Sequence, residues 1–135
     1  MKSIKESLIN CILMVLALSF IACESTDRGT DQNQPQNTIV LLKFKTQPEK
    51  EAETVLELTK LIENVKLEPH FIKIKLHVDS KDPTNVLLYE EWADENYYST
   101  AHMETEHITA FMQNSRNFLV GPPEITFWKL KKEFK

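Results

Sequence analysis

The sequence has little that could cross-link the chain or hold it permanently in a bilayer. It contains only two cysteines, Cys11 and Cys23, so no disulfide framework is expected and stability must come from an apolar core. The longest apolar run, residues 11–22 (CILMVLALSFIA), is shorter than the roughly 20 residues that a helix needs to cross a bilayer. The formal net charge of -4 gives no electrostatic reason to bind nucleic acid. These features argue against a disulfide scaffold, a permanent membrane span and a nucleic-acid partner.

The first residues are typical of an exported lipoprotein. Lys2 and Lys5 give a basic start, the apolar run follows, and polar residues begin directly after Cys23, which is the layout of a secretory signal. The motif FIAC at 20–23 resembles the bacterial lipobox, whose cysteine is diacylated on sulfur and becomes the new N-terminus. We therefore expect 1–22 to be a signal peptide and Cys23 to anchor the exported protein to the cell envelope. The alternative is an ordinary cleaved signal followed by an unmodified cysteine.

Composition divides the rest of the chain into a tether and one domain. Residues 24–37 (ESTDRGTDQNQPQN) contain no large apolar side chain, which is typical of a disordered segment. We therefore expect the lipidated cysteine and this stretch, 23–37, to tether a domain that occupies 38–135. A flexible segment of this length spans roughly 20 Å, enough to hold the domain away from a membrane.

Within 38–135 the apolar pattern switches between the periods of strands and helices. Apolar side chains recur at every second position in TIVLLKFK (38–45) and FIKIKLHV (71–78), which indicates strands with one buried face. From Pro48 to Val65 they recur near helical spacing, and the glutamates at the start of this segment suit a helix N-terminus. The remaining segments are expected as a strand at 85–92, a helical region at 94–118 that breaks near His107, and a strand at 124–130.

The order of these elements predicts an α+β fold. Strand, helix, strand, strand, helix, strand is the ferredoxin-like split βαββαβ arrangement with a four-stranded antiparallel sheet. Two helices would cover one face of the sheet, and the other face would expose more aromatic surface than a monomer usually does. We therefore expect a homodimer that forms sheet to sheet. The side chains that strand parity assigns to this outer face are Leu41, Phe71, Tyr89, Trp128 and Leu130.

A stretch in the second half of the domain resembles a known family. The strand end LYEEW (88–92) is followed by His102 and His107, and this pattern resembles the Glu-x-Trp and two-histidine signature of the antibiotic biosynthesis monooxygenase (ABM) family. Glu68-Pro69 opens the second strand as in that family, whereas His70 stands where glycine is frequent. The resemblance implies a dimeric α/β barrel with an apolar pocket between sheet and helices. Characterised members oxidise quinols or anthrones with dioxygen and without metal or flavin, and many others have no established activity.

The resemblance makes His102 and Glu90 the candidate catalytic residues. An imidazole beside the substrate could take its phenolic proton. Glu90 lies on the helix-facing side of its strand, where a carboxylate needs a partner or a raised pKa, and we expect it to fix the tautomer of His102 through a hydrogen bond. The alternative for both side chains is a structural hydrogen bond without a catalytic role.

Four further side chains are expected to line the pocket, namely Trp92, Tyr97, His107 and Phe111. Trp92 could equally be a core residue, and only one of Tyr97 and Tyr98 should face inward, because adjacent helical residues point apart. No metal is expected, because residues 102 and 107 would point about 140° apart on a continuous helix. No cofactor is expected either, and the ligand should be a small apolar or aromatic molecule.

Two functions fit this interpretation. The first is a cofactor-independent monooxygenase that oxidises a small quinol-like or other electron-rich aromatic substrate with dioxygen. The second is a non-catalytic envelope lipoprotein that binds a small ligand in the same pocket. Both need the same apolar cavity, so the sequence leaves both open.

The anchor can be tested at Cys23. Two acyl chains give stable membrane binding where one is marginal, so Cys23→Ser should release the protein from the membrane or block its maturation. Cell fractionation and mass spectrometry of the mature N-terminus would measure this. Cys11→Ser, in the segment expected to be removed, is the matched control and should change neither result. An unmodified N-terminus on the mature wild-type protein would contradict the lipoprotein interpretation.

Overall fold

The computed structural model describes residues 36–135. The expected signal peptide at 1–22, the lipidated Cys23 and nearly all of the expected tether at 23–37 lie outside the described residues, so these assignments stay predictions. From residue 36 to the last residue, no helix is both long enough and apolar enough to cross a membrane.

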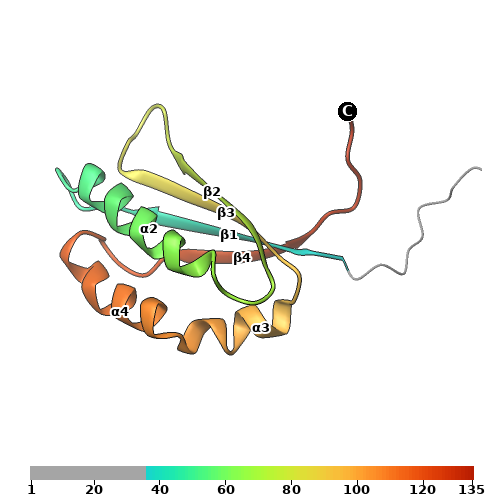
Figure 1. Cartoon of the computed structure of the whole chain (residues 1–135). Coiled ribbons are helices and arrows are strands. Elements are labelled where there is room, and N and C mark those ends of the chain that lie inside the picture. The colour runs from blue at the N-terminus through green and yellow to red at the C-terminus, as the bar shows by residue number, and fades with distance from the viewer. Residues whose placement is uncertain (1–35) are drawn as a thin grey trace, which may run out of the picture. The chain divides into compact units, whose positions relative to one another are not determined.

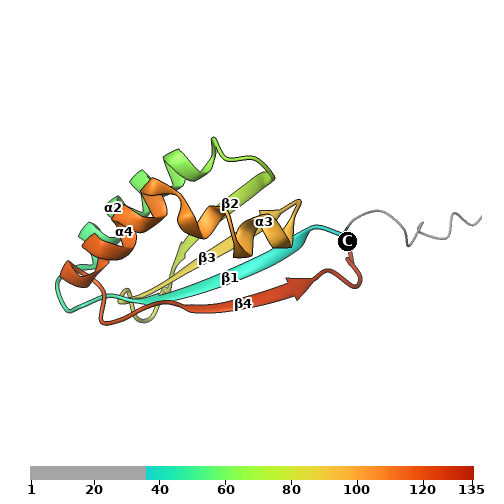
Figure 2. The same cartoon turned by 90° about the horizontal axis from the view of Figure 1, so that it is seen from below.

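Four antiparallel strands form one sheet, and the helices lie together on one of its faces (Figures 1 and 2). The strand order is β2-β3-β1-β4, with β3 and β1 in the centre. The predicted ferredoxin-like α+β fold is therefore confirmed. In chain order the elements are β1 (Thr38–Lys45), α2 (Glu51–Val65), β2 (Phe71–Val78), β3 (Asn85–Trp92), α3 (Glu95–Ser99), the 3-10 turn η1 (His102–Glu104), α4 (Glu106–Asn114), the 3-10 turn η2 (Ser115–Asn117) and β4 (Glu124–Lys129).

The core has two parts, both formed where the helix-facing side chains of the sheet meet the helices. One cluster, near the β2–β3 hairpin, includes Leu88 and Phe118, and the other, near the opposite end of the sheet, includes Val40 and Trp92. Leu42 packs against both clusters. Alternation along each strand places these side chains on the same face, so the period seen in the sequence leads directly to the core.

The first helix begins later than predicted. Helix α2 starts at Glu51 rather than at Pro48, and Lys50 is its N-cap residue. The reason is Glu49, whose φ of 66° is in the left-handed region and cannot belong to a right-handed helix. Pro48 therefore lies in the turn that precedes the helix.

A β-bulge in β2 changes the face on which one aromatic side chain lies. Phe71 pairs with Trp92, but Lys73 pairs with Glu91, so Ile72 is the extra residue. The Phe71 ring consequently packs edge-on against the Trp92 ring at 5.9 Å, on the helix-covered face. The prediction that Phe71 lies on the outer face is therefore wrong. Its neighbour His70 has a φ of 65°, a conformation that glycine adopts without strain, which explains why glycine is frequent at this position in the family that the sequence resembles.

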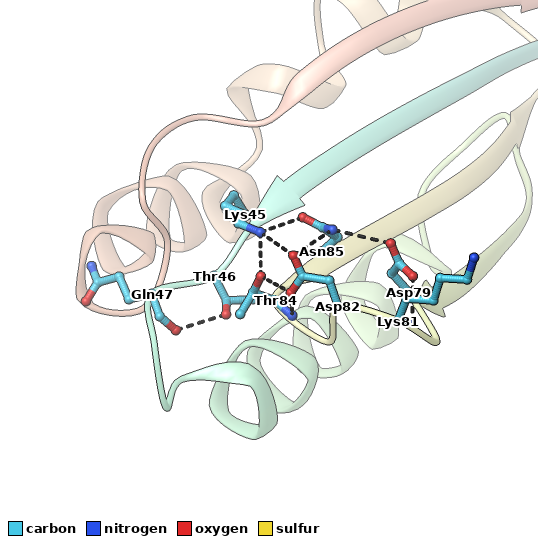
Figure 3. Close-up of polar contacts among 8 residues, drawn as sticks. All are labelled: Lys45, Thr46, Gln47, Asp79, Lys81, Asp82, Thr84 and Asn85. Atoms are coloured by element: carbon cyan, nitrogen blue, oxygen red, sulfur yellow. Dashed lines mark hydrogen bonds and ion pairs between the residues drawn. The ribbon is translucent and has the colours of Figure 1, made fainter.

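A polar network closes the sheet at the β2–β3 hairpin (Figure 3). The ammonium group of Lys45, at the end of β1, contacts Oδ2 of Asp82 at 2.8 Å and Oδ1 of Asn85 at 2.9 Å. Hydrogen bonds from Lys45 and Thr84 lower the pKa of Asp82 to about 2. The backbone N–H of Thr46 also donates to the carbonyl of Thr84. These bonds attach the central strand to the hairpin and stabilise the strand register on which the site depends.

Candidate active site

A small cavity lies between the two parts of the core. Its volume is about 120 Å³, similar to the roughly 150 Å³ apolar cavity that admits one benzene molecule in an engineered protein. Three polar side chains, Glu90, Tyr98 and His102, border an otherwise apolar wall. An apolar cavity with a few convergent polar groups is the usual form of a small-molecule site. Its apolar lining includes Leu42, Leu61, Ile62, Val65, Ile74, Leu88, Ile108 and Phe111.

The carboxylate of Glu68 organises the polar side of the site. Glu68 lies in the turn between α2 and β2, and its side chain is only 5% exposed. Its Oε2 accepts a hydrogen bond from the Tyr97 hydroxyl at 3.1 Å and lies 2.8 Å from Nδ1 of His102. Its Oε1 contacts Nε2 of His107. One carboxylate therefore connects three side chains from the turn after β3, η1 and α4.

Glu68 determines the tautomer of His102. A carboxylate accepts hydrogen bonds and cannot donate them, so Nδ1 carries the hydrogen and Nε2 keeps a free lone pair. Among the described residues, none forms a hydrogen bond with this Nε2 atom. Burial lowers the pKa of His102, and the hydrogen bond and charge of Glu68 oppose this only in part. The imidazole at the cavity wall is therefore neutral at neutral pH and can accept a proton.

The prediction that Glu90 would hold His102 is wrong. Oε2 of Glu90 instead accepts a hydrogen bond from Nε1 of Trp92 at 2.9 Å. The two residues are two apart on β3 and point to the same face, so this partner is close at hand. The carboxyl group of Glu90 is nonetheless at the cavity wall.

The raised pKa expected for a carboxyl group in this position is observed at Glu90. The residue is 5% exposed. Burial raises its pKa to about 7, the Trp92 hydrogen bond opposes this, and the charge of Glu68 adds to it. At neutral pH, Glu90 can therefore either hold a proton and donate a hydrogen bond or release the proton.

Trp92 does not border the cavity but supports the residues that do. Its side chain is completely buried, with the ring of His102 at 4.7 Å and the ring of Tyr98 at 5.3 Å. This placement is that of the core residue considered as an alternative from the sequence. Tyr97 and His107 also lie away from the cavity, around Glu68, whereas Phe111 borders it.

Tyr98, rather than Tyr97, presents its side chain to the cavity. Its ring stacks on that of His102 at 4.7 Å and 24°, and in residues 36–135 its hydroxyl group has no hydrogen-bond partner. Burial raises its pKa, so the hydroxyl stays protonated and can donate. Asp94 caps α3 by accepting from the backbone N–H groups of Asn96 and Tyr97, which sets where the short helix begins and hence which tyrosine faces inward.

Sequence reasoning did not identify the role of Glu68. The only signal was the Glu68-Pro69 pair, which was noted as part of a family resemblance and not as part of the site. Two histidines and one glutamate meet here, yet over residues 36–135 no group of three or more such side chains has an arrangement that could hold a metal ion. The cluster is thus a hydrogen-bonded unit in which one carboxylate serves both imidazoles.

Comparison with known proteins decides the family. Residues 38–114, more than half of the chain, match the family model described as antibiotic biosynthesis monooxygenase. The chain belongs to this family. The resemblance inferred from the Glu-x-Trp strand end and the two histidines is therefore confirmed. No curated protein matches the sequence.

Solved structures share the ABM fold at low sequence identity. A protein from Pseudomonas aeruginosa is 20% identical with a TM-score of 0.65, and the match covers 72% of this chain and 96% of that one. A conserved protein from Methanosarcina mazei Go1 is 24% identical with a TM-score of 0.65 over 72% and 95% of the two chains. A structure named as an antibiotic biosynthesis monooxygenase is 23% identical with a TM-score of 0.63 over 70% and 99%. At these identities the likeness concerns the fold alone.

The raised pKa of Glu90 predicts a pH-dependent stability. In the unfolded chain this carboxyl group ionises near its ordinary pKa of 4.5, but in the folded protein it stays neutral up to about 7. Its contribution is thus fully present below pH 4.5 and is lost as the pH rises through about 7. Glu90→Gln keeps an acceptor for Trp92 but cannot ionise. Between about pH 4 and about pH 8, wild type should lose up to about 3 kcal/mol of unfolding free energy that the variant keeps.

Urea unfolding over this pH range would measure the difference. Glu91→Gln is the matched control, because Glu91 is the next residue along β3. Burial would raise the pKa of Glu91, but hydrogen bonds from Tyr89 and Lys73 outweigh this effect and lower it. The control should therefore show no gain at high pH. Parallel pH curves for wild type and Glu90→Gln would contradict the assignment of the raised pKa.

Proposed function

We propose that this protein is a cofactor-independent monooxygenase that oxidises a small quinol-like or other electron-rich aromatic molecule with dioxygen. The observation that carries the proposal is the neutral imidazole of His102, which is held by Glu68 and has its free Nε2 at the wall of a dry cavity. Membership of the ABM family supports monooxygenase chemistry in general. The cavity volume of about 120 Å³ supports an occupant with a single aromatic ring.

The polar groups suit the first step of such a reaction. Nε2 of His102 takes the proton of the substrate hydroxyl, which leaves an electron-rich phenolate. The Tyr98 hydroxyl and protonated Glu90 donate hydrogen bonds to the resulting anion in a site with little water, where such bonds are strong. Proton transfer to a positioned base and stabilisation of the anion are the two tasks that this chemistry asks of the protein.

The redox balance needs no added reductant. The anion transfers two electrons to dioxygen, one oxygen atom forms a bond to a ring carbon, and the other oxygen leaves as water. A hydroquinone would become a hydroxyquinone, with the two electrons supplied by the substrate itself. The residues at the cavity wall only bind, orient and move protons.

The test is oxygen uptake with His102→Ala. A positioned general base contributes roughly 10²- to 10⁴-fold to a rate, so this variant should lower hydroquinone-dependent oxygen uptake at least about a hundredfold while melting like a folded protein. His77→Ala, which removes an exposed imidazole from β2, is the matched control and should leave the rate unchanged. An oxygen electrode with a panel of hydroquinones would measure the rates.

Two outcomes would count against the proposal. Equal rates in folded wild type and His102→Ala would remove His102 from the mechanism. Absence of oxygen uptake in wild type, together with ligand binding in the cavity, would favour the alternative of a non-catalytic binding module. Both results are interpretable because the control variant reports on the general effect of losing an imidazole.

The proposal includes a homodimer formed through the outer face of the sheet. Proteins with the ABM fold are commonly dimeric. In the described chain, Trp128 and Leu130 are 55% and 51% exposed, and Trp128 pairs with Ile39 next to the pair of Leu41 and Tyr89. Such an exposed apolar surface is typical of an interface. We also assign the protein to the cell envelope through Cys23, as the first residues of the sequence indicate.

Light scattering would test the dimer. Wild type at tens of micromolar should have the mass of a dimer, and Trp128→Lys should shift it toward the monomer, because a charge would be buried without a partner. Leu67→Lys is the matched control, since Leu67 is 84% exposed in the turn after α2, away from the outer face. A wild-type monomer, or equal masses for both variants, would contradict the proposed interface.

A further inference from the structure

An open groove adjoins the cavity on the side of α4. Its volume is about 670 Å³. Four residues, Met103, Ile108, Met112 and Pro122, line both the groove and the cavity, so the two spaces meet at these side chains. Met103 and Met112 are 39% and 42% exposed. Methionine side chains are unbranched and adaptable, and they can move to admit a ligand at this apolar mouth.

The groove has a fixed backbone and a nearly uncharged wall. The side-chain amide of Gln47 donates to the backbone carbonyls of Arg116 and Leu119 at 3.0 and 2.9 Å, which holds the segment after α4 in place. Among the residues that line the groove, Arg116 is the only charged one. A preformed apolar surface that continues from a ring-sized cavity suits an apolar extension of the same ligand.

Volume separates the two parts of such a ligand. The cavity of about 120 Å³ has room for one ring, whereas the groove is more than five times larger. A substrate that fills both must therefore combine a small ring with a longer and flexible part. A charged or strongly polar extension would leave its groups unpaired against the methionine, isoleucine and proline side chains at the mouth.

We propose that the groove binds a flexible, uncharged tail of the substrate while the ring of the same molecule occupies the cavity. The substrate class is then a hydroquinone or related electron-rich ring that carries an alkyl or other apolar chain. The inference rests on the proposed function, because it assigns the ring to the cavity beside His102. It adds to that function a second binding region that selects by the tail and takes no part in the chemistry.

Gly121 allows the groove to be blocked without disturbing the fold. A Cβ atom added at Gly121 would meet no other atom within 4 Å, and its φ is not positive, so a side chain fits there without backbone strain. Gly121→Phe would place a ring in the groove. Ala110→Phe adds a larger ring-bearing side chain to an exposed position of α4 that does not line the groove, and serves as the matched control.

The experiment measures the binding of two probes to the full chain without oxygen. The probes are methylhydroquinone and decylhydroquinone, the latter below its micelle concentration, and titration calorimetry gives each dissociation constant. Wild type should bind decylhydroquinone at least about tenfold more tightly, the gain expected from burying two methylene groups. Gly121→Phe should abolish this preference and leave methylhydroquinone binding within about twofold of wild type, because the cavity is unchanged. Ala110→Phe should keep the preference.

Each other result overturns the inference. Equal affinity of wild type for the two probes, or a preference that survives in Gly121→Phe, would show that the groove does not hold the tail, and so would failure of both probes to bind. If melting curves show that Gly121→Phe does not fold, Val120→Glu replaces it, because Val120 lines the groove and is 66% exposed. Oxygen uptake is measured separately. A tail preference without uptake would support the groove and count against the monooxygenase, and uptake without a preference would do the reverse.

Discussion

The buried carboxylate of Glu68 is the interaction on which the polar side of the site depends. It satisfies the Tyr97 hydroxyl, Nδ1 of His102 and Nε2 of His107 at once. A buried carboxylate is costly unless it is hydrogen-bonded, and here three donors from separate segments satisfy it. Because these donors come from α3, η1 and α4, the cluster also joins the turn after α2 to the helical region that covers the other half of the sheet. Removal of this one carboxylate would therefore loosen His102 and leave polar groups of its neighbours without a partner.

Two titratable groups at the cavity are shifted in opposite directions. Burial raises the pKa of Glu90 to about 7 and lowers that of His102. Both shifts favour the neutral form, because a charge is costly in an apolar environment. At neutral pH the wall thus holds a carboxylic acid that can donate and an imidazole that can accept, and environments that separate such roles are typical of sites for proton transfer. The same dryness that produces the shifts would strengthen hydrogen bonds to a substrate anion.

The sheet explains why these groups meet where they do. Glu90 and Trp92 point to the helix-covered face because they are two apart on β3, and the bulge in β2 brings Phe71 to the edge of the Trp92 ring. Trp92 in turn packs against His102 and Tyr98. The tryptophan is therefore a support for the cavity wall, and its value to the site lies in the positions of its neighbours. The groove beyond Met103 and Met112 extends this wall toward solvent without adding charge.

The sequence alone determined the fold, because strand and helix periods are local properties of the chain. Alternation in β1 and β3 and the helical spacing of α2 are set by neighbouring residues, and their order leaves one familiar arrangement. The family and the importance of His102 also followed from residues that lie close together in the sequence. The bulge at Phe71 was not predictable in this way, because a single extra residue depends on pairing with a distant strand.

Only the tertiary structure decided which side chains pair with one another. Glu68 and His102 are 34 residues apart, and no local pattern indicates that the turn after α2 lies beside η1. The sequence therefore assigned Glu90 to the imidazole, although Trp92 was the nearer partner for that carboxyl group. The choice of Tyr98 over Tyr97 likewise depends on where the Asp94 cap starts α3 above the sheet. Partner choice among buried polar groups is a matter of distance in space and of desolvation, and both exist only once the chain has folded.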